Sequence, residues 1–219
     1  VLLSGWVGAG PKVEELETLF GQYVGAKHAV TLNSCSSALF LALKVLEVEG
    51  KEVITTPMTF VSSNHAILLN HAKPVFCDIE PDTLNIDPQS IADKITDRTA
   101  AILVVHFGGH PCDMDPILEI AKARNIPVVE DAAHACGARY KGSMVGHLGT
   151  ITCFSFHALK NLSTCDGGML TTDDEELAER LKKLRWMGIS RDTWNRFRKD
   201  ENPKRWEYEI SEVGFKFQM

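Results

Sequence analysis

Apolar and polar residues alternate along the chain in two rhythms. The stretch PKVEELETLFGQY, at residues 11–23, repeats apolar residues every three or four positions, which predicts an amphipathic helix. Pro11 suits the first helical position, and Gly25 is a typical residue for ending a helix. Seven short apolar runs then follow, each with the length of a buried strand: His28–Leu32, Glu52–Thr56, Pro74–Asp78, Ala100–His106, Pro127–Asp131, Thr150–Phe156 and Gly168–Thr172.

Segments with helical spacing separate most of these runs. They are Ser36–Glu47, Thr59–Asn70, Pro88–Lys94 and Asp113–Arg124, and a last one follows the final run at Asp173–Met187. Strands that are apolar on both faces and alternate with helices are typical of a parallel sheet with helices on both sides. We therefore predict an α/β fold, a three-layer αβα domain with a mostly parallel seven-stranded sheet.

The alternating pattern ends at Met187. Residues 188–219 are charged, aromatic and irregular, so we divide the chain into an α/β domain at 1–187 and an excursion at 188–219. Because the excursion reaches Met219 without a signal that ends a helix or strand, we expect it to lead toward a further segment. The aromatic, basic stretch from Trp186 to Phe217 suits either a contact surface or a flexible loop.

Composition narrows the possible classes of protein. A formal net charge of −6 disfavours non-specific nucleic-acid binding, which needs a basic face. No stretch reaches the roughly 18 apolar residues of a membrane span, and the first ten residues lack the basic start of a signal peptide. The six cysteines have no C-x-x-C spacing, which favours reduced thiols in a cytoplasmic protein. We expect His106 and His110, in HFGGHP, to be loop residues rather than metal ligands, because two glycines and a proline disfavour a helix there.

The first candidate site follows the first predicted strand. In open α/β sheets, ligands bind beyond the carboxyl ends of the strands. There the chain reads NSCSSA, at residues 33–38, and enters a helix. Small residues at a helix N-terminus can bind a phosphate through backbone N–H groups, and a serine that only caps the helix is the alternative. The stretch is neither a Walker A motif nor G-x-G-x-x-G, so it signals neither a nucleoside triphosphate nor a dinucleotide.

The second candidate site follows the fifth run, where Glu130 and Asp131 close an apolar strand. A buried carboxylate is costly unless it has a partner, and a charged ligand nitrogen could be that partner for Asp131. Alternatively, Asp131 caps a short helix. His134, three residues on, is either a second ligand contact or a half-buried imidazole that protein groups satisfy.

The third candidate is Lys160, which follows the sixth run in SFHALKNLSTCDGG. Ser155 precedes it on the strand, and Thr164, Asp166 and two glycines shape the turn that follows. A lone lysine is usually a surface residue. A lysine, a carboxylate at a strand end and a phosphate turn together are what pyridoxal phosphate requires of a protein.

The order and spacing of several stretches resemble the DegT/DnrJ/EryC1/StrS family of sugar aminotransferases, which are fold-type I pyridoxal-phosphate enzymes. The likeness runs from SGWVGAGPKVEELE to the chain end through NSCSSAL, EVITTPMTFVSS, AKPVFCDIEPDTLNID, VHFGGHPCDMD, VVEDAAHACGARYKG, VGHLGTITCFSFHALKNLSTCDGGMLTTDD and MGISRDTWNRF. By this resemblance the α/β domain is the large domain that binds pyridoxal phosphate, and a small C-terminal domain belongs after Met219.

The resemblance also assigns roles to the candidate residues. Lys160 forms the covalent bond to the cofactor aldehyde and then moves a proton, while Asp131 pairs with the pyridine nitrogen and keeps it protonated. His134 stands where many members have glutamine, near the cofactor hydroxyl. The remaining contacts fall to Cys35, Ser36 and Ser155 at the phosphate and to Phe60 against the ring.

The implied reaction moves an amino group from an amino acid, glutamate being the expected donor, to a nucleotide-linked keto sugar. GISRDTWNRF followed by WEYEI resembles members that act at C4 of UDP-sugars. The resemblance further implies a homodimer with its sites at the subunit interface and an enzyme of amino-sugar biosynthesis for cell-surface polysaccharides or secondary metabolites.

Three stretches depart from the usual family pattern. SCSSA is found where the family usually has SGTAA, so that Cys35 replaces a glycine, and TCDGG replaces the commoner TGEGG. GFKFQM stands where many members have a GYNYRM-like stretch. Lys216 thus replaces an asparagine that reaches the partner subunit's phosphate, and we expect it to make a charged version of that contact.

Two alternatives remain open. One is a pyridoxal-phosphate sugar dehydratase of the same family, although such members replace the lysine with histidine or add an iron–sulfur cluster. The other is a truncated, non-catalytic or regulatory relative that keeps the fold, since the chain stops where members continue.

Overall fold

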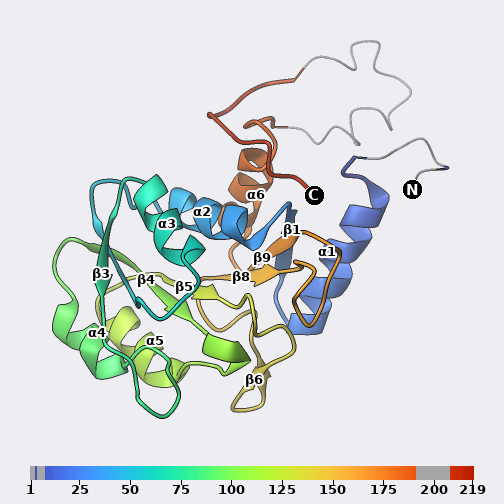
Figure 1. Cartoon of the computed structure of the whole chain (residues 1–219). Coiled ribbons are helices and arrows are strands. Elements are labelled where there is room, and N and C mark those ends of the chain that lie inside the picture. Colours follow the sequence, from blue (N-terminus) through green and yellow to red (C-terminus); the bar gives the residue numbers. More distant parts are fainter. Residues whose placement is uncertain (1–2, 4–7, 191–207) are drawn as a thin grey trace.

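The computed structural model describes residue 3, residues 8–190 and residues 208–219. Its centre is a seven-stranded sheet with the order β1-β9-β8-β5-β4-β2-β3 (Figure 1). The strands are β1 (His28–Leu32), β2 (Glu52–Thr55), β3 (Lys73–Phe76), β4 (Thr99–Val105), β5 (Val128–Asp131), β8 (Ile151–Ser155) and β9 (Gly168–Thr172). All seven predicted strands are therefore present, with ends that differ by a few residues.

One strand runs against the others. β9 pairs antiparallel with both β1 and β8, whereas β8, β5, β4, β2 and β3 form parallel pairs. The carboxyl ends of β1, β4, β5 and β8 consequently meet at the same edge of the sheet, and this edge is where the candidate site residues follow the strands.

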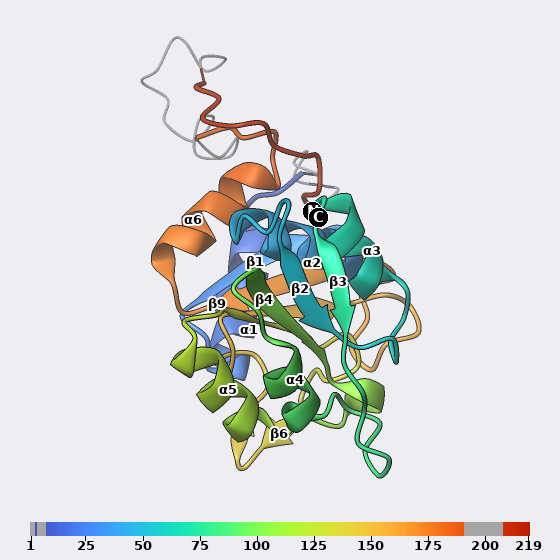
Figure 2. The ribbon, with the colours of Figure 1, turned by 90° about the vertical axis from the view of Figure 1, so that its left-hand side faces the viewer.

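Helices cover both faces of the sheet and give the predicted three layers. Figure 2 shows α2, α3 and α6 above the sheet and α4 and α5 below it. The helices are α1 (Pro11–Val24), α2 (Cys35–Val45), α3 (Ser62–Leu69), α4 (Pro88–Lys94), α5 (Met114–Ala123) and α6 (Glu175–Leu184).

Two sets of buried apolar side chains hold these layers together. Alternate strand residues such as Leu103 and Val129 pack with α2, α3 and α6, while Ile102 and Val128 face α4 and α5. Further along the second face, Phe20 of α1 packs edge-on against Phe154, with ring centroids 5.1 Å apart. Because successive side chains of a strand point to opposite faces of the sheet, the buried residues divide into one set on each face.

Local chemistry explains where the helices begin and end. The Asp174 side chain accepts the amide N–H of Leu177 and so caps the N-terminus of α6, whose first turn is acidic and whose last turn is basic. Gly25 ends α1 in the left-handed conformation, with φ of 83°. A helix predicted over Thr59–Asn70 begins only at Ser62, because Thr59 and Phe60 belong to the turn that precedes α3.

The structure also contains elements that the pattern did not predict. β6 (Arg139–Tyr140) and β7 (Ser143–Met144) form a short hairpin, and Phe107–Gly109 form a 3₁₀ turn, η2. β3 is an edge strand with partly exposed residues rather than a strand buried on both faces. In the part of the chain that the structure describes, no helix is both long enough and apolar enough to cross a membrane.

Residues 208–219 contact the α/β domain. Lys216 pairs with Trp186 and Ile210 with Ile189 across isolated bridges, and the rings of Phe215 and Phe217 pack on Phe40 of α2. The amide of Asn33 donates to the carbonyl of Phe217 at 2.7 Å. Most of the predicted excursion, at 191–207, lies outside the described residues.

Candidate active site

A cavity of about 340 Å³ opens at the edge where β4, β5 and β8 end. Seven of the eight residues proposed from the sequence line it: Cys35, Ser36, Phe60, Asp131, His134, Ser155 and Lys160. The eighth, Lys216, lies beside Trp186 and does not line this cavity. Residues spread over 125 positions of sequence are therefore gathered by the sheet topology into one place.

The N-terminus of α2 forms one wall of the cavity. Ser34 caps the helix, because its Oγ accepts the amide N–H of Ser37 at 3.1 Å. The first N–H groups of a helix have no carbonyl partner within it, so those of Cys35 and Ser36 remain available to an anion. The serine cap and the anion site are thus both present, since they use different amide groups.

Gly168, at the start of β9, is packed against this turn. A Cβ atom on Gly168 would lie 2.4 Å from the carbonyl carbon of Ser34 and 2.6 Å from the amide nitrogen of Cys35. Any larger residue would displace the α2 N-terminus. Burial, with help from Asp131 and Cys153, raises the pKa of the Cys35 thiol well above its ordinary value, so that this thiol stays neutral beside the anion site.

Asp131 ends β5 and reaches the cavity while being 5% exposed. Its Oδ2 accepts a hydrogen bond from the hydroxyl of Ser63 at 2.6 Å, and its Oδ1 accepts the amide N–H of Ala133 at 3.1 Å. No helix follows Asp131 in the described chain before the β6–β7 hairpin, so the helix-cap alternative is wrong. Each carboxylate oxygen can accept a further bond, which leaves Asp131 able to meet a charged nitrogen.

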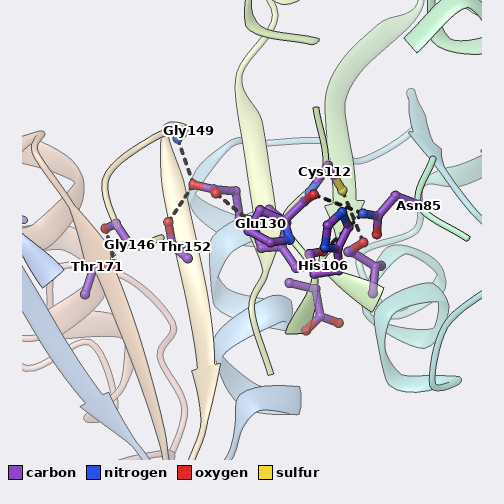
Figure 3. Close-up of polar contacts among 12 residues, drawn as sticks. Asn85, His106, Cys112, Glu130, Gly146, Gly149, Thr152 and Thr171 are labelled. Carbon is purple, nitrogen blue, oxygen red and sulfur yellow. Dashed lines mark hydrogen bonds and ion pairs between the residues drawn. The ribbon is translucent and has the colours of Figure 1, made fainter. Parts of the chain in front are cut away.

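Glu130, the adjacent residue, lies in a closed pocket of protein groups. Its Oε1 accepts bonds from the amide of Gly149 and the hydroxyl of Thr152, each at 2.7 Å, and its Oε2 lies 2.9 Å from Nε2 of His106 (Figure 3). The amide of Cys112 donates to Nδ1 of His106, so the ring proton is on Nε2 and is donated to Glu130. Burial raises the pKa of Glu130, but these donors together lower it below its ordinary value.

Lys160 lies in the loop between β8 and β9 and is half-buried. Its ammonium group has no ion-pair partner among the residues that the structure describes. Ser155, at the end of β8, is buried, and its hydroxyl accepts the amide N–H of His157 at 3.4 Å. The Lys160 side chain therefore lines the cavity without a salt bridge to any described residue.

His134 and Phe60 lie at the exposed side of the cavity. Burial and the nearby Lys160 lower the pKa of His134, so its imidazole is neutral at neutral pH and can donate or accept a hydrogen bond. Phe60 is 75% exposed, which leaves its ring face free for a planar ligand.

Sequence reasoning missed several residues of the site. His106 and His157 line the cavity, and Ser63 reaches the site through its hydrogen bond to Asp131, but none of the three was proposed as a site residue from the sequence. His106 is a loop residue as expected, but it is buried and bonded to Glu130. No group of three or more potential metal ligands occurs within the described ranges.

Comparison with known proteins adds close relatives. The spore coat polysaccharide biosynthesis protein SpsC from Bacillus subtilis (strain 168) is 50% identical over 219 residues, which are 100% of this chain and 56% of SpsC. The UDP-4-amino-4-deoxy-L-arabinose–oxoglutarate aminotransferase of Shewanella sediminis (strain HAW-EB3) is 44% identical over 220 residues, and the chain again spans 56% of its length. The chain therefore spans little more than half of these relatives.

A solved structure agrees with the fold. The protein Spr1654 from Streptococcus pneumoniae, in its PMP form, superposes with a TM-score of 0.90 at 36% identity and covers 100% of this chain and 59% of that one. Its PLP form gives a TM-score of 0.88. The model of the DegT/DnrJ/EryC1/StrS aminotransferase family matches residues 1–219, and the chain belongs to that family.

Proposed function

We propose that the full-length protein containing this chain is a pyridoxal-phosphate-dependent aminotransferase that acts on a nucleotide-linked keto sugar. One observation carries the proposal: a single cavity brings together the Lys160 amine, the Asp131 carboxylate and the N-terminus of α2. Family membership and the PLP and PMP forms of Spr1654 support the same cofactor.

The residues present fit this cofactor. Amide groups at the α2 N-terminus, with Ser155 nearby, would hold its phosphate, and Gly168 leaves room for that turn. Asp131 would hold the proton of the ring nitrogen, His134 would contact the ring hydroxyl, and Phe60 would lie against the ring. These side chains cover each polar group of pyridoxal phosphate.

The chain's own groups divide the chemical work. Pyridoxal phosphate, when bound, supplies a ring that takes up electrons from the reacting carbon. Lys160 Nζ would hold the cofactor through its aldehyde carbon, and its free amine would be the group that carries a proton to and from the reacting carbon atoms. Ser63 and Ala133 each donate a hydrogen bond to Asp131 and so hold its carboxylate in place at the end of β5.

Glutamate is the donor that we infer, and C4 of a UDP-sugar is the acceptor position that we favour. The Shewanella relative is named for an aminotransferase of a UDP-4-amino sugar, which supports this choice. We also propose that residues 188–219 lead to a smaller domain and that the protein works as a cytoplasmic homodimer. Leu159, 87% exposed beside Lys160, supports burial of the cavity mouth by a second subunit.

Covalent trapping tests the proposal. The full-length protein is incubated with pyridoxal phosphate, reduced with borohydride and digested, and the label should lie on Lys160. Lys160→Ala should abolish the label, whereas Lys122→Ala, at an exposed position on α5, should keep it. A label that persists in Lys160→Ala would contradict the assignment.

The substrate requires a separate assay. The full-length protein should form an amino sugar when given glutamate and a panel of UDP- and dTDP-linked keto sugars. Turnover of dTDP-sugars alone would contradict the UDP preference, and a labelled Lys160 without any turnover would favour the non-catalytic relative.

A further inference from the structure

Ser63 is a buried hydroxyl that the proposed chemistry does not yet use. It is the second residue of α3, is 0% exposed, and comes from an element 68 positions away from Asp131 in sequence. It does not cap its helix, because α3 has no side-chain cap. Its hydroxyl is instead directed at the carboxylate of Asp131.

The direction of the hydrogen bonds around Ser63 follows from counting protons. Its Oγ lies 2.6 Å from Oδ2 of Asp131 and 2.7 Å from Oγ1 of Thr59. A serine hydroxyl has one proton, and the carboxylate can only accept, so Ser63 donates to Asp131 and Thr59 donates to Ser63. A distance of 2.6 Å is typical of a hydroxyl bonded to an ionised acceptor.

This relay joins two parts of the cavity. The turn that carries Thr59 and Phe60 is held to the start of α3, where the Ser63 amide donates to the Phe60 carbonyl at 3.2 Å. Through Ser63 the same turn is fixed to Asp131, at the end of β5. The residue expected to lie against the cofactor ring and the residue expected to hold its nitrogen are therefore connected by one side chain.

We propose that Ser63 is a positioning residue. With Thr59 it orients the Asp131 carboxylate toward the bound cofactor, and it fixes the position of the Phe60 turn relative to that carboxylate. The inference rests on the proposed function, since it assumes that pyridoxal phosphate binds in this cavity. Without the Ser63 hydroxyl, Oδ2 loses its charge-assisted bond, and the amide of Ala133 is the one donor to the Asp131 carboxylate that remains among the described residues.

Cofactor titration of Ser63→Ala in the full-length protein tests the role. The dissociation constant for pyridoxal phosphate should rise about tenfold or more, because a hydrogen bond to a charged group is lost. The visible circular dichroism of the bound cofactor should also change, since that signal reports how the ring is held. Thr59→Val, which keeps the bond from Ser63 to Asp131, should show the same changes at a smaller size, about threefold.

Thr171→Val is the matched control. Thr171 is as buried as Ser63, and its hydroxyl donates to the carbonyl of Gly146 away from the cavity (Figure 3). It should lower thermal stability while leaving the dissociation constant and the dichroism unchanged.

The outcomes separate the two ideas. A wild-type protein that takes up no pyridoxal phosphate overturns the proposed function. A wild-type protein that binds it, with Ser63→Ala giving the same affinity and dichroism, overturns the positioning role alone. If Ser63→Ala does not fold, Thr59→Val decides, and an unchanged spectrum in that variant rejects the relay.

Discussion

Glu130 and Asp131 are neighbours in sequence, are both buried carboxylates, and have opposite surroundings. Glu130 accepts bonds from His106, Gly149 and Thr152 and is closed off by protein groups. Asp131 accepts two bonds and faces the cavity. Because successive strand residues point to opposite faces of a sheet, one carboxylate completes the core while the other stays available to a ligand.

This difference teaches how to recognise a functional carboxylate in a buried strand. Burial alone does not distinguish the two residues, since both are almost inaccessible to solvent. What distinguishes them is whether protein donors use the acceptor capacity of the carboxylate fully. Four predictions test this contrast.

The largest effect is expected from Glu130→Ala. The substitution leaves His106, Thr152 and the Gly149 amide without their acceptor, so the free energy of unfolding should fall by about 3–5 kcal/mol, because each unsatisfied donor costs about 1–3 kcal/mol. Urea unfolding measures it, and Glu119→Ala on the exposed face of α5 is the control. A loss similar to that of the control would show that the closed pocket does not depend on Glu130.

Asp131→Asn should act on binding rather than on folding. Asparagine Oδ1 can still accept the amide N–H of Ala133, and its NH₂ group can donate to Ser63 Oγ, whose own proton can turn to the Phe60 carbonyl at 3.2 Å. The free energy of unfolding should therefore change by about 1 kcal/mol or less. The affinity for pyridoxal phosphate should fall roughly 10–100-fold, because the charged partner of the ring nitrogen is lost. Absorbance titration measures the affinity. A stability loss as large as that of Glu130→Ala would remove the contrast between the two residues.

The contrast also has a pH dependence. The pKa of Glu130 is lowered in the folded state from its ordinary value of 4.5, despite burial, by its bonds to His106, Gly149 and Thr152. Its contribution to stability is therefore complete above pH 4.5 and is lost as the pH falls toward the folded-state pKa. The stability gap between wild type and Glu130→Gln should be constant near neutral pH and should narrow on acidification. Urea unfolding over a pH series measures the gap. A gap that widens in acid would mean that folding raises the pKa of Glu130 rather than lowering it.

The smallest effect concerns strain in the loop that carries Lys160, which lines the same cavity as Asp131. Cys165, in the loop after Lys160, has φ of 72°, a left-handed conformation that costs energy for any residue with a Cβ atom. Cys165→Gly should therefore stabilise the protein by about 1 kcal/mol. Cys35→Gly is the matched control, since Cys35 is the first residue of α2 and is helical, so that it should lose stability instead. Thermal unfolding compares the two variants. If both substitutions change the stability in the same direction, the left-handed conformation of Cys165 does not cost the expected energy.

The sequence predicted the strands of the sheet well because a buried strand produces an apolar run, whether it lies parallel or antiparallel to its neighbours. For the same reason it did not show that β9 runs antiparallel, since a run of apolar residues has no direction of its own. The two-residue strands β6 and β7 are too short to produce a period.

Part of the site was equally accessible from sequence. Lys160 and Asp131 follow apolar runs, and the ends of adjacent strands meet. Ser63 could not be found in this way because its role depends on how α3 packs over the end of β5, which no spacing reports. The relation of Lys216 to a partner subunit stays a prediction.

The position of β1 at one edge of the sheet affects how the protein is made. β1 pairs only with β9 within the described chain, His28 with Thr172 and Leu32 with Gly168, so it has no strand partner until residues 168–172 have been synthesised. At about 5–20 residues per second, ribosomal synthesis delays that pairing by roughly 7–30 s. Strands β2, β3, β4 and β5 can associate during this interval, whereas the N-terminus of α2 meets Gly168 only after β9 has been made. The anion site is therefore expected to be one of the last parts of the nascent domain to form.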